Sequence, residues 1–343
     1  MRQGSLASIR RRDLLAAAAT GACARLAHAQ DKPVQRPLRI GLVPDFAPVW
    51  WESKLSIFTQ AMSELGRVEG RDFVFFRSGL FFGADPQQAT ERVMQARPDL
   101  ILASNLAYAA AVHKVTQTIP VVMWVSGFPV EGGLAESLTH PGGNVTGLTI
   151  YAGGEVFGKL VQLIHEVKPS MKRIGALNSY VPPLHPVGER DIVVRGMQGA
   201  ARALGLDLRV LEIAKAERVD DALTKIAADR IEALVLTSAP AIHPRRHDIM
   251  RFVVERRLPT ITDAGWESAG DPQPLMDYEP DFGALMRQAA PYVDRILWRG
   301  TKPGELPIQL PTRFVFRINL KTARGIRLTM PHTLLARADQ LIE

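Results

Sequence analysis

The sequence predicts an α/β protein of two lobes, each built on a parallel, doubly wound sheet. Short apolar runs alternate with helical segments along most of the chain, which is the pattern of such sheets. The alternation stops at the Pro- and Gly-rich stretch 141–147 and then begins again. The 343 residues exceed one typical core and suit two. We therefore expect two halves of similar architecture.

The first half contains four expected strands separated by three expected helices. The run Leu-Arg-Ile-Gly-Leu-Val at 38–43 has the apolar composition of a buried parallel strand. The expected strands are 38–43, 72–77, 99–103 and 120–125, and the expected helices are 53–65, 86–96 and 106–116.

The second half repeats this rhythm and is followed by further elements. Its expected strands are 173–177, 206–212, 233–237 and 260–262, and its expected helices are 157–167, 190–204, 219–228 and 247–257. After these come a strand at 275–278, a long helix at 282–298 and an extended segment at 306–310.

The C-terminal stretch has its own pattern. Phe314, Phe316 and Ile318 alternate with polar or smaller residues, which indicates a half-buried strand. Gly325 marks the end of one helical turn, and Pro331 is a favourable start for a final amphipathic helix. We expect this stretch to serve the fold as a crossing and an anchor.

Residues 1–29 have the features of an export signal. The basic run Arg10–Arg12 precedes an apolar stretch at 14–24, and Ala27-His28-Ala29 is a cleavage motif before Gln30. Arg11 and Arg12 resemble the pair of a twin-arginine signal; an ordinary secretory signal is the alternative. The sequence therefore predicts a periplasmic protein, cleaved near Ala29/Gln30.

Removal of this signal changes both the charge and the cysteine count. The formal charge of +7 includes five arginines and one aspartate in 1–29, so about +3 remains, too little to indicate a nucleic-acid partner such as DNA. Cys23, the single cysteine, lies inside the signal. The mature chain is therefore expected to lack disulfides, cysteine catalysis and thiolate metal sites.

Candidate ligand-binding residues follow the expected strands, because parallel α/β sheets bind ligands beyond the carboxyl ends of their strands. Small hydroxyl and amide groups dominate there and suit carboxylates and other small polar groups. The alternative is that they only cap helices and form turns. The candidates are Pro44, Asp45, Ser104, Asn105, Leu106, Ser126, Phe128, Ser179, Tyr180, Ser238 and Asp263, with Tyr278 and Trp124 as candidate aromatic walls.

The sequence offers no catalytic set, metal site or cofactor motif. Residues 153–160 nearly match a phosphate-binding loop, but Leu160 stands where the motif requires Ser or Thr for Mg²⁺. His243 and His247 are spaced for a helical metal pair, but Pro244 and two arginines separate them. No G-x-S-x-G nucleophile elbow occurs. We therefore expect a binding protein.

Two long motifs resemble one family. Residues 129–148, with PVEGGL and SLTHPGGNVTGL, are similar to its PVxxGLVxSLxRPGGNxTGL stretch, and 318–343 are similar to its INLKTA…RADxVIE ending. The family is that of ABC-transporter substrate-binding proteins of the tryptophan/tyrosine-uptake type, with a type I periplasmic-binding-protein fold. The likeness extends over roughly 37–343.

The resemblance implies two Rossmann-like lobes joined by three hinge crossings. The N-terminal lobe would comprise 38–148 and the C-terminal lobe 153–263, each with part of 275–343, and the crossings would lie near 148–153, 263–281 and 306–312. A monomer would capture an amino acid or an aromatic or carboxylate-bearing solute in the interlobe cleft. It would then deliver that solute to an ABC permease in the inner membrane.

The chain departs from the family where ligands are expected. Phe128 stands where the family has Asp, and Asp277 and Glu279 flank Tyr278 where it has Ser and Gly. Tryptophan and tyrosine are therefore not carried over as ligands. Two alternatives stay open: a sensory module of the same fold for a signalling partner, and an enzyme on a flavodoxin-like fold.

Overall fold

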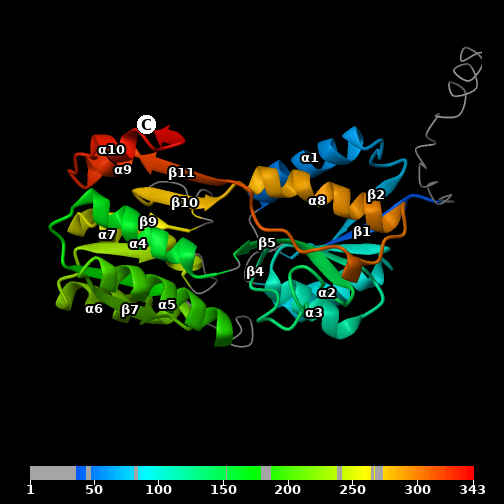
Figure 1. Cartoon of the computed structure of the whole chain (residues 1–343), viewed down its shortest axis with the longest axis horizontal. Helices are drawn as coiled ribbons and strands as arrows, with labels where there is room; N and C mark the ends of the chain where they lie inside the picture. Colours follow the sequence, from blue (N-terminus) through cyan, green and yellow to red (C-terminus); the bar gives the residue numbers. More distant parts are fainter. Residues whose placement is uncertain are drawn as a thin grey trace, which may run out of the picture.

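The computed structural model describes residues 36–43, 48–80, 84–151, 153–178, 187–237, 242–263, 266 and 273–343. These residues form two α/β lobes, each with a sheet between two helical layers (Figure 1). The predicted export signal lies outside them. Within these ranges, no helix combines the length and apolarity needed to cross a bilayer. The predicted fold of two doubly wound lobes is confirmed.

The first lobe contains a five-stranded parallel sheet of order β2-β1-β3-β4-β5. Helices α1 and α8 pack together on one face, and α2 and α3 pack together on the other. The strands are β1 (Leu38–Val43), β2 (Phe73–Arg77), β3 (Leu100–Ala103), β4 (Val121–Gly127) and β5 (Val145–Tyr151). The helices are α1 (Pro48–Glu64), α2 (Pro86–Gln95), α3 (Leu106–Val115) and α8 (Phe282–Leu297).

Strand β5 begins inside the stretch that the sequence indicated as a turn. The side chain of Asn144 donates hydrogen bonds to the carbonyls of Thr116, at 3.1 Å, and Ile119, at 2.8 Å, which fixes the segment beside β4. Gly147 has φ +124°, and a Cβ there would lie 2.1 Å from the carbonyl oxygen of Met123. This glycine therefore allows close strand approach and does not end the strand.

The second lobe contains a seven-stranded sheet of order β12-β11-β10-β9-β8-β6-β7, parallel except where β11 runs antiparallel to β10. Helices α4 and α5 cover one face, and α6 and α7 the other. The strands are β6 (Arg173–Asn178), β7 (Asp207–Glu212), β8 (Ala233–Leu236), β9 (Thr260–Thr262), β10 (Met276–Pro280), β11 (Phe314–Asn319) and β12 (Gln340–Ile342). The helices are α4 (Glu155–Val167), α5 (Val187–Ala203), α6 (Val219–Ala228), α7 (Arg246–Arg256), α9 (Leu320–Gly325) and α10 (His332–Leu335), with 3₁₀ turns at Ala216–Arg218, His243–Arg245 and Pro303–Glu305.

The chain passes between the lobes three times. It leaves β5 for α4, leaves β10 for α8, and returns to β11 after Gln309 has paired with β5. The amide of Gln309 donates to the carbonyl of Gly147 at 3.0 Å, and its carbonyl accepts from the amide of Thr149 at 2.9 Å. Figure 1 shows β5 and the segment that leads to β11 passing between the lobes.

The end of the chain differs from the expected final helix. Helix α10 has only four residues, and β12 then adds to the edge of the second sheet, parallel to β11. Asp339 fixes this pairing: its backbone amide donates to the carbonyl of Phe316 at 2.8 Å, and its carboxylate accepts from the amide of Phe316 at 2.8 Å. Strand β12 thus covers the edge of β11 that would otherwise be free, where the sequence led us to expect part of a helix.

The stretch resembling a phosphate-binding loop has a packing role. Gly154 precedes the first turn of α4, and Gly196 of α5 lies against it. A Cβ on Gly196 would lie 2.1 Å from the carbonyl oxygen of Gly154. The glycines therefore permit close contact between two helices.

Candidate functional site

The residues after β3 are used locally by the fold. The hydroxyl of Ser104 donates to the carbonyl of Val43 at 3.0 Å, which ties the ends of β3 and β1 together. The side-chain oxygen of Asn105 accepts from the amide of Tyr108 at 3.1 Å and caps α3. Leu106 is buried. The sequence left two roles open for Ser104 and Asn105, ligand binding and local structure. The hydrogen bonds described above serve local structure.

The end of β4 is arranged differently. Ser126 is fully buried, and its hydroxyl makes no hydrogen bond within the part of the chain that the structure describes. Phe128 is buried with φ +49°, a left-handed conformation that bulky residues rarely adopt. Such backbone strain concentrates at ligand-binding and switch regions. The end of β4 therefore combines an unsatisfied polar group with a strained aromatic residue.

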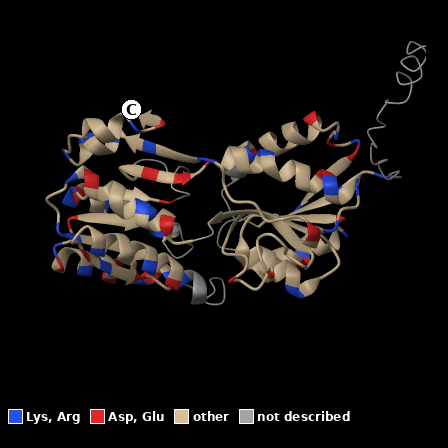
Figure 2. Cartoon of the chain, viewed as in Figure 1, with Lys and Arg blue, Asp and Glu red and all other residues tan. Residues whose placement is uncertain are grey.

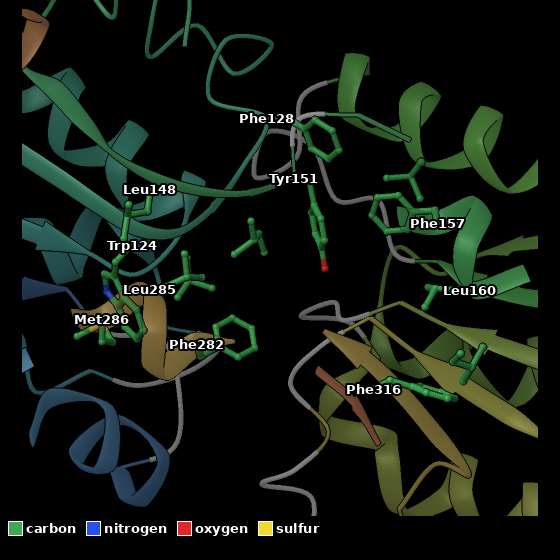
Figure 3. Packing of buried hydrophobic residues seen from close by; sticks show 14 of the residues in the cluster. Trp124, Phe128, Leu148, Tyr151, Phe157, Leu160, Phe282, Leu285, Met286 and Phe316 are labelled. Carbon is green, nitrogen blue, oxygen red and sulfur yellow. The ribbon is translucent and has the colours of Figure 1, made fainter. Parts of the chain in front are cut away.

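Tyr151, the last residue of β5, joins the two lobes. Its hydroxyl donates a hydrogen bond to Oδ2 of Asp263 at 3.0 Å, and Asp263 directly follows β9. The exposed fractions are 7% for Tyr151 and 3% for Asp263. The Tyr151 ring contacts Phe128 and Phe157, with centroids 6.0 and 5.0 Å away (Figure 3). Sequence reasoning missed Tyr151 because it missed the strand that ends there.

The second lobe contributes further polar groups at its strand ends. Thr262, the last residue of β9, is buried, and its hydroxyl has no hydrogen-bond partner within the described ranges. The hydroxyl of Thr237, after β8, donates to the side-chain oxygen of Asn178, at the end of β6, at 2.9 Å. The remaining predicted site residues lie outside the described residues: Pro44, Asp45, Ser179, Tyr180 and Ser238.

Tyr278 lies on β10 and packs against β11. Its ring stacks on Phe314, with 5.1 Å between centroids and 14° between planes. Burial raises the pKa of the Tyr278 hydroxyl above its usual value. This aromatic pair lies on one face of the strand pair.

The acids beside Tyr278 have a partner that the sequence did not indicate. Arg317 lies opposite Asp277 on β11, with 2.8 Å between its Nε and Oδ1 of Asp277, and it also contacts the carboxylate of Glu279. All three side chains are largely buried. The two acids therefore form a compact charged cluster with Arg317 (Figure 2 shows the acidic patch on β10 beside the basic patch on β11).

Trp124 is a core residue of the first lobe. It is fully buried, and Figure 3 shows its ring beside Leu285 and Met286 of α8. In the described part of the chain, no three His, Cys, Asp or Glu side chains are grouped to hold a metal ion.

Two lobes joined by three crossings, with buried polar and aromatic groups at facing strand ends, define a protein that binds a small solute between domains. The chain belongs to the family of ABC transporter substrate binding proteins, whose model matches residues 58–342. Proteins of this family bind solutes outside the cytoplasm and work with a permease in the membrane.

Individual relatives are distant. A tyrosine-binding protein of Clostridioides difficile is 23% identical over 271 residues, which cover 78% of this chain and 75% of the relative. A conserved domain protein of Vibrio cholerae has TM-score 0.76 and 22% identity, covering 89% of this chain and 100% of that one. A Streptococcus pneumoniae ABC domain in complex with L-Trp has TM-score 0.75 and 19% identity, with the same coverage. The two structures show a shared fold.

Proposed function

We propose that this protein is the periplasmic receptor of an ABC importer and that it captures an amino acid, or another aromatic or carboxylate-bearing solute, between its lobes. The observation that carries the proposal is the hydrogen bond from Tyr151 to Asp263, which joins the strand ends of the two sheets. This hydrogen bond forms only when the two strand ends are close together. Its position therefore suits a protein that binds its solute by closing the hinge between the lobes.

The ligand class follows from the groups at this position. Phe128 and Tyr151 offer apolar ring surface, and buried hydroxyls at the strand ends offer hydrogen bonds to a polar head. Sites for small molecules combine apolar walls with a few placed polar groups. The tyrosine and L-Trp named for two relatives are compatible with this class.

The remaining features of the proposal rest on the sequence. The export signal ends near Ala29/Gln30, and the mature protein acts as a monomer that delivers its solute to an inner-membrane permease. The moving bodies are the two lobes of 38–148 and 153–263, each with part of 275–343.

A thermal-shift screen tests the proposal. The mature protein, starting at Gln30, is mixed with a library of amino acids, aromatic acids, aromatic amines and sugars, and the melting temperature is followed. A solute at ~100 times its Kd should add ~2.7 kcal/mol to the free energy of unfolding. We expect at least one aromatic or carboxylate-bearing solute to raise the melting temperature. If no solute raises it at millimolar concentration, the proposal is wrong.

A further inference from the structure

Four arginines have a left-handed backbone conformation that is usual for glycine at the ends of helices. Arg97, Arg230, Arg257 and Arg327 have φ between +49° and +58°, at the ends of α2, α6, α7 and α9, and all four are exposed. Residues other than glycine pay a steric cost there. A cation near the C-terminus of a helix is favourable, which explains an arginine at any one of these positions. It does not explain why three of the four lie at one edge of one lobe.

Arg230, Arg257 and Arg327 lie at the outer edge of the second sheet, where its parallel strands begin. Arg230 precedes β8 and Arg257 precedes β9, and these two strands pair with each other. Strand β11 runs antiparallel to β10, so it ends at this edge, where the amide of Asn319 donates to the carbonyl of Leu275 at 2.8 Å. Helix α9 and Arg327 follow directly. Figure 1 shows α7 and α9 at the end of this lobe that is turned away from the first lobe.

Two further arginines enlarge the basic surface at this edge. Arg256 lies in the last turn of α7 and Arg324 in the last turn of α9, and both are exposed. With Arg230, Arg257 and Arg327 they form the outer basic face. None of the five makes an ion pair with another residue in the described ranges. Figure 2 shows basic segments along this outer end of the second lobe. Their charges are therefore available to a partner.

The acids beside the outer basic face do not neutralise it. Glu232, just before β8, accepts hydrogen bonds from the backbone amides of Lys172 at 2.8 Å and Arg173 at 3.1 Å. Asp229 and Glu255 are sequence neighbours of the face. Lys172 and Arg173 add positive charge at the same edge, because Arg173 begins β6, which pairs with β8. The edge as a whole therefore carries an excess of positive charge.

The opposite edge of the same sheet has the opposite charge. Asp263 follows β9, Glu279 lies near the end of β10, and Asp281 comes directly after that strand. The second lobe is therefore positive at its outer edge and negative at the edge that faces the first lobe. An anionic surface would attract the outer edge and repel the inner one, and so would orient the lobe. The arginines are spread over the ends of three helices, which suits a broad anionic surface better than a single small anion.

We infer that the outer basic face docks the protein on the anionic phospholipid headgroups of a membrane. Guanidinium groups bind phosphate oxygens through paired hydrogen bonds, and basic residues near an anionic leaflet are attracted to it. The family works with a permease in a membrane, so a membrane is an anionic surface that this protein meets. Docked in this way, the second lobe holds its acidic edge and the space between the lobes away from the headgroups. The inference does not depend on which solute the protein binds.

Co-sedimentation with vesicles tests the inference on the mature protein, starting at Gln30. We expect binding to vesicles of mixed phosphatidylglycerol and phosphatidylcholine and none to vesicles of phosphatidylcholine alone, and we expect high salt to abolish the binding. Each arginine near an anionic surface is worth about fivefold in affinity, so Arg230→Gly, Arg257→Gly and Arg327→Gly together should weaken binding about a hundredfold. Glycine adopts the left-handed conformation without steric cost, so the melting temperature of this triple variant should not fall.

Arg97→Gly is the matched control. Arg97 has the same backbone conformation at the end of a helix, but it belongs to the first lobe. Its replacement should leave the binding of anionic vesicles unchanged. The inference is overturned if the triple variant binds these vesicles as tightly as the parent does, or if Arg97→Gly weakens binding as much as the triple variant.

An acidic polypeptide is the other large anionic partner to be distinguished. If the parent binds poly-glutamate and does not bind the anionic vesicles, the outer basic face suits a protein and the inference is wrong. Equal binding to anionic and neutral vesicles, or binding to neither, would also overturn it. The solute screen is independent of these outcomes, so a failure of membrane docking leaves the proposed function untouched.

Discussion

The hydroxyl of Tyr151 and the carboxylate of Asp263 form a hydrogen bond of 3.0 Å between residues 112 positions apart, one at the end of each sheet. Both side chains are buried, so the bond is shielded from competing water. Tyr151 ends the strand that leads into the first crossing, and Asp263 lies before the second. The bond therefore couples two crossings as well as two lobes.

Tyr151→Phe removes this hydrogen bond and keeps the ring contacts with Phe128 and Phe157. Because the acceptor is a buried carboxylate, we expect the free energy of unfolding to fall by about 2 kcal/mol. We also expect the Kd for the solute to change, since the bond spans the lobes that close. Urea denaturation followed by fluorescence gives the first value, and calorimetric titration gives the second.

Tyr292→Phe provides a comparison within one lobe. The hydroxyl of Tyr292 donates to the carbonyl of Pro307 at 2.5 Å. Loss of this hydrogen bond should cost about 1 kcal/mol and leave the Kd unchanged. If Tyr151→Phe behaves in the same way, the bond between the lobes has no part in binding.

Much of the fold could be predicted from the sequence because buried parallel strands have a recognisable apolar composition. The structure at the end of the chain could not be predicted in this way. Strand β12 forms because it pairs with β11, about 20 residues earlier, and local sequence patterns do not show such pairing. Tyr151 was missed for a related reason: Gly147 suggests a turn, and only the packing against Met123 shows a strand. Arg317 pairs with Asp277 across two strands, a register that local patterns do not give.

Arg317→Met tests the charged cluster on β10 and β11. The change leaves the buried carboxylates of Asp277 and Glu279 close together without the guanidinium that lies beside them. Removing one partner of a buried ion pair typically costs about 3–5 kcal/mol, and we expect a loss in this range, measured by urea denaturation.

The same variant with Asp277→Asn and Glu279→Gln provides the control. Without the two negative charges, the repulsion disappears, and we expect at least half of the lost stability to return. If the triple variant is as unstable as Arg317→Met, packing of the arginine side chain, and not its charge, is what stabilises the strands.

Tyr292 gives the protein a sensitivity to alkaline pH. Burial raises the pKa of its hydroxyl to about 12, above the ordinary value of about 10. The folded state holds this proton more tightly than the unfolded state, so the stabilisation is complete below pH 10 and is lost as the pH rises from about 10 to about 12. We expect the urea midpoint to fall more steeply over this interval in the parent than in Tyr292→Phe. Parallel curves for the two proteins would contradict the assignment.

Gly196→Ala and Gly199→Ala test the contact between α4 and α5 with two changes in one helix. A Cβ on Gly196 would lie 2.1 Å from the carbonyl oxygen of Gly154, whereas nothing lies within 4 Å of a Cβ on Gly199. We expect Gly196→Ala to push the helices apart and cost about 1–3 kcal/mol. Gly199→Ala should stabilise the protein by about 0.5–1 kcal/mol, because alanine favours a helix over the unfolded chain. Urea denaturation measures both, and stabilisation by both changes would show that the two helices do not need this close contact.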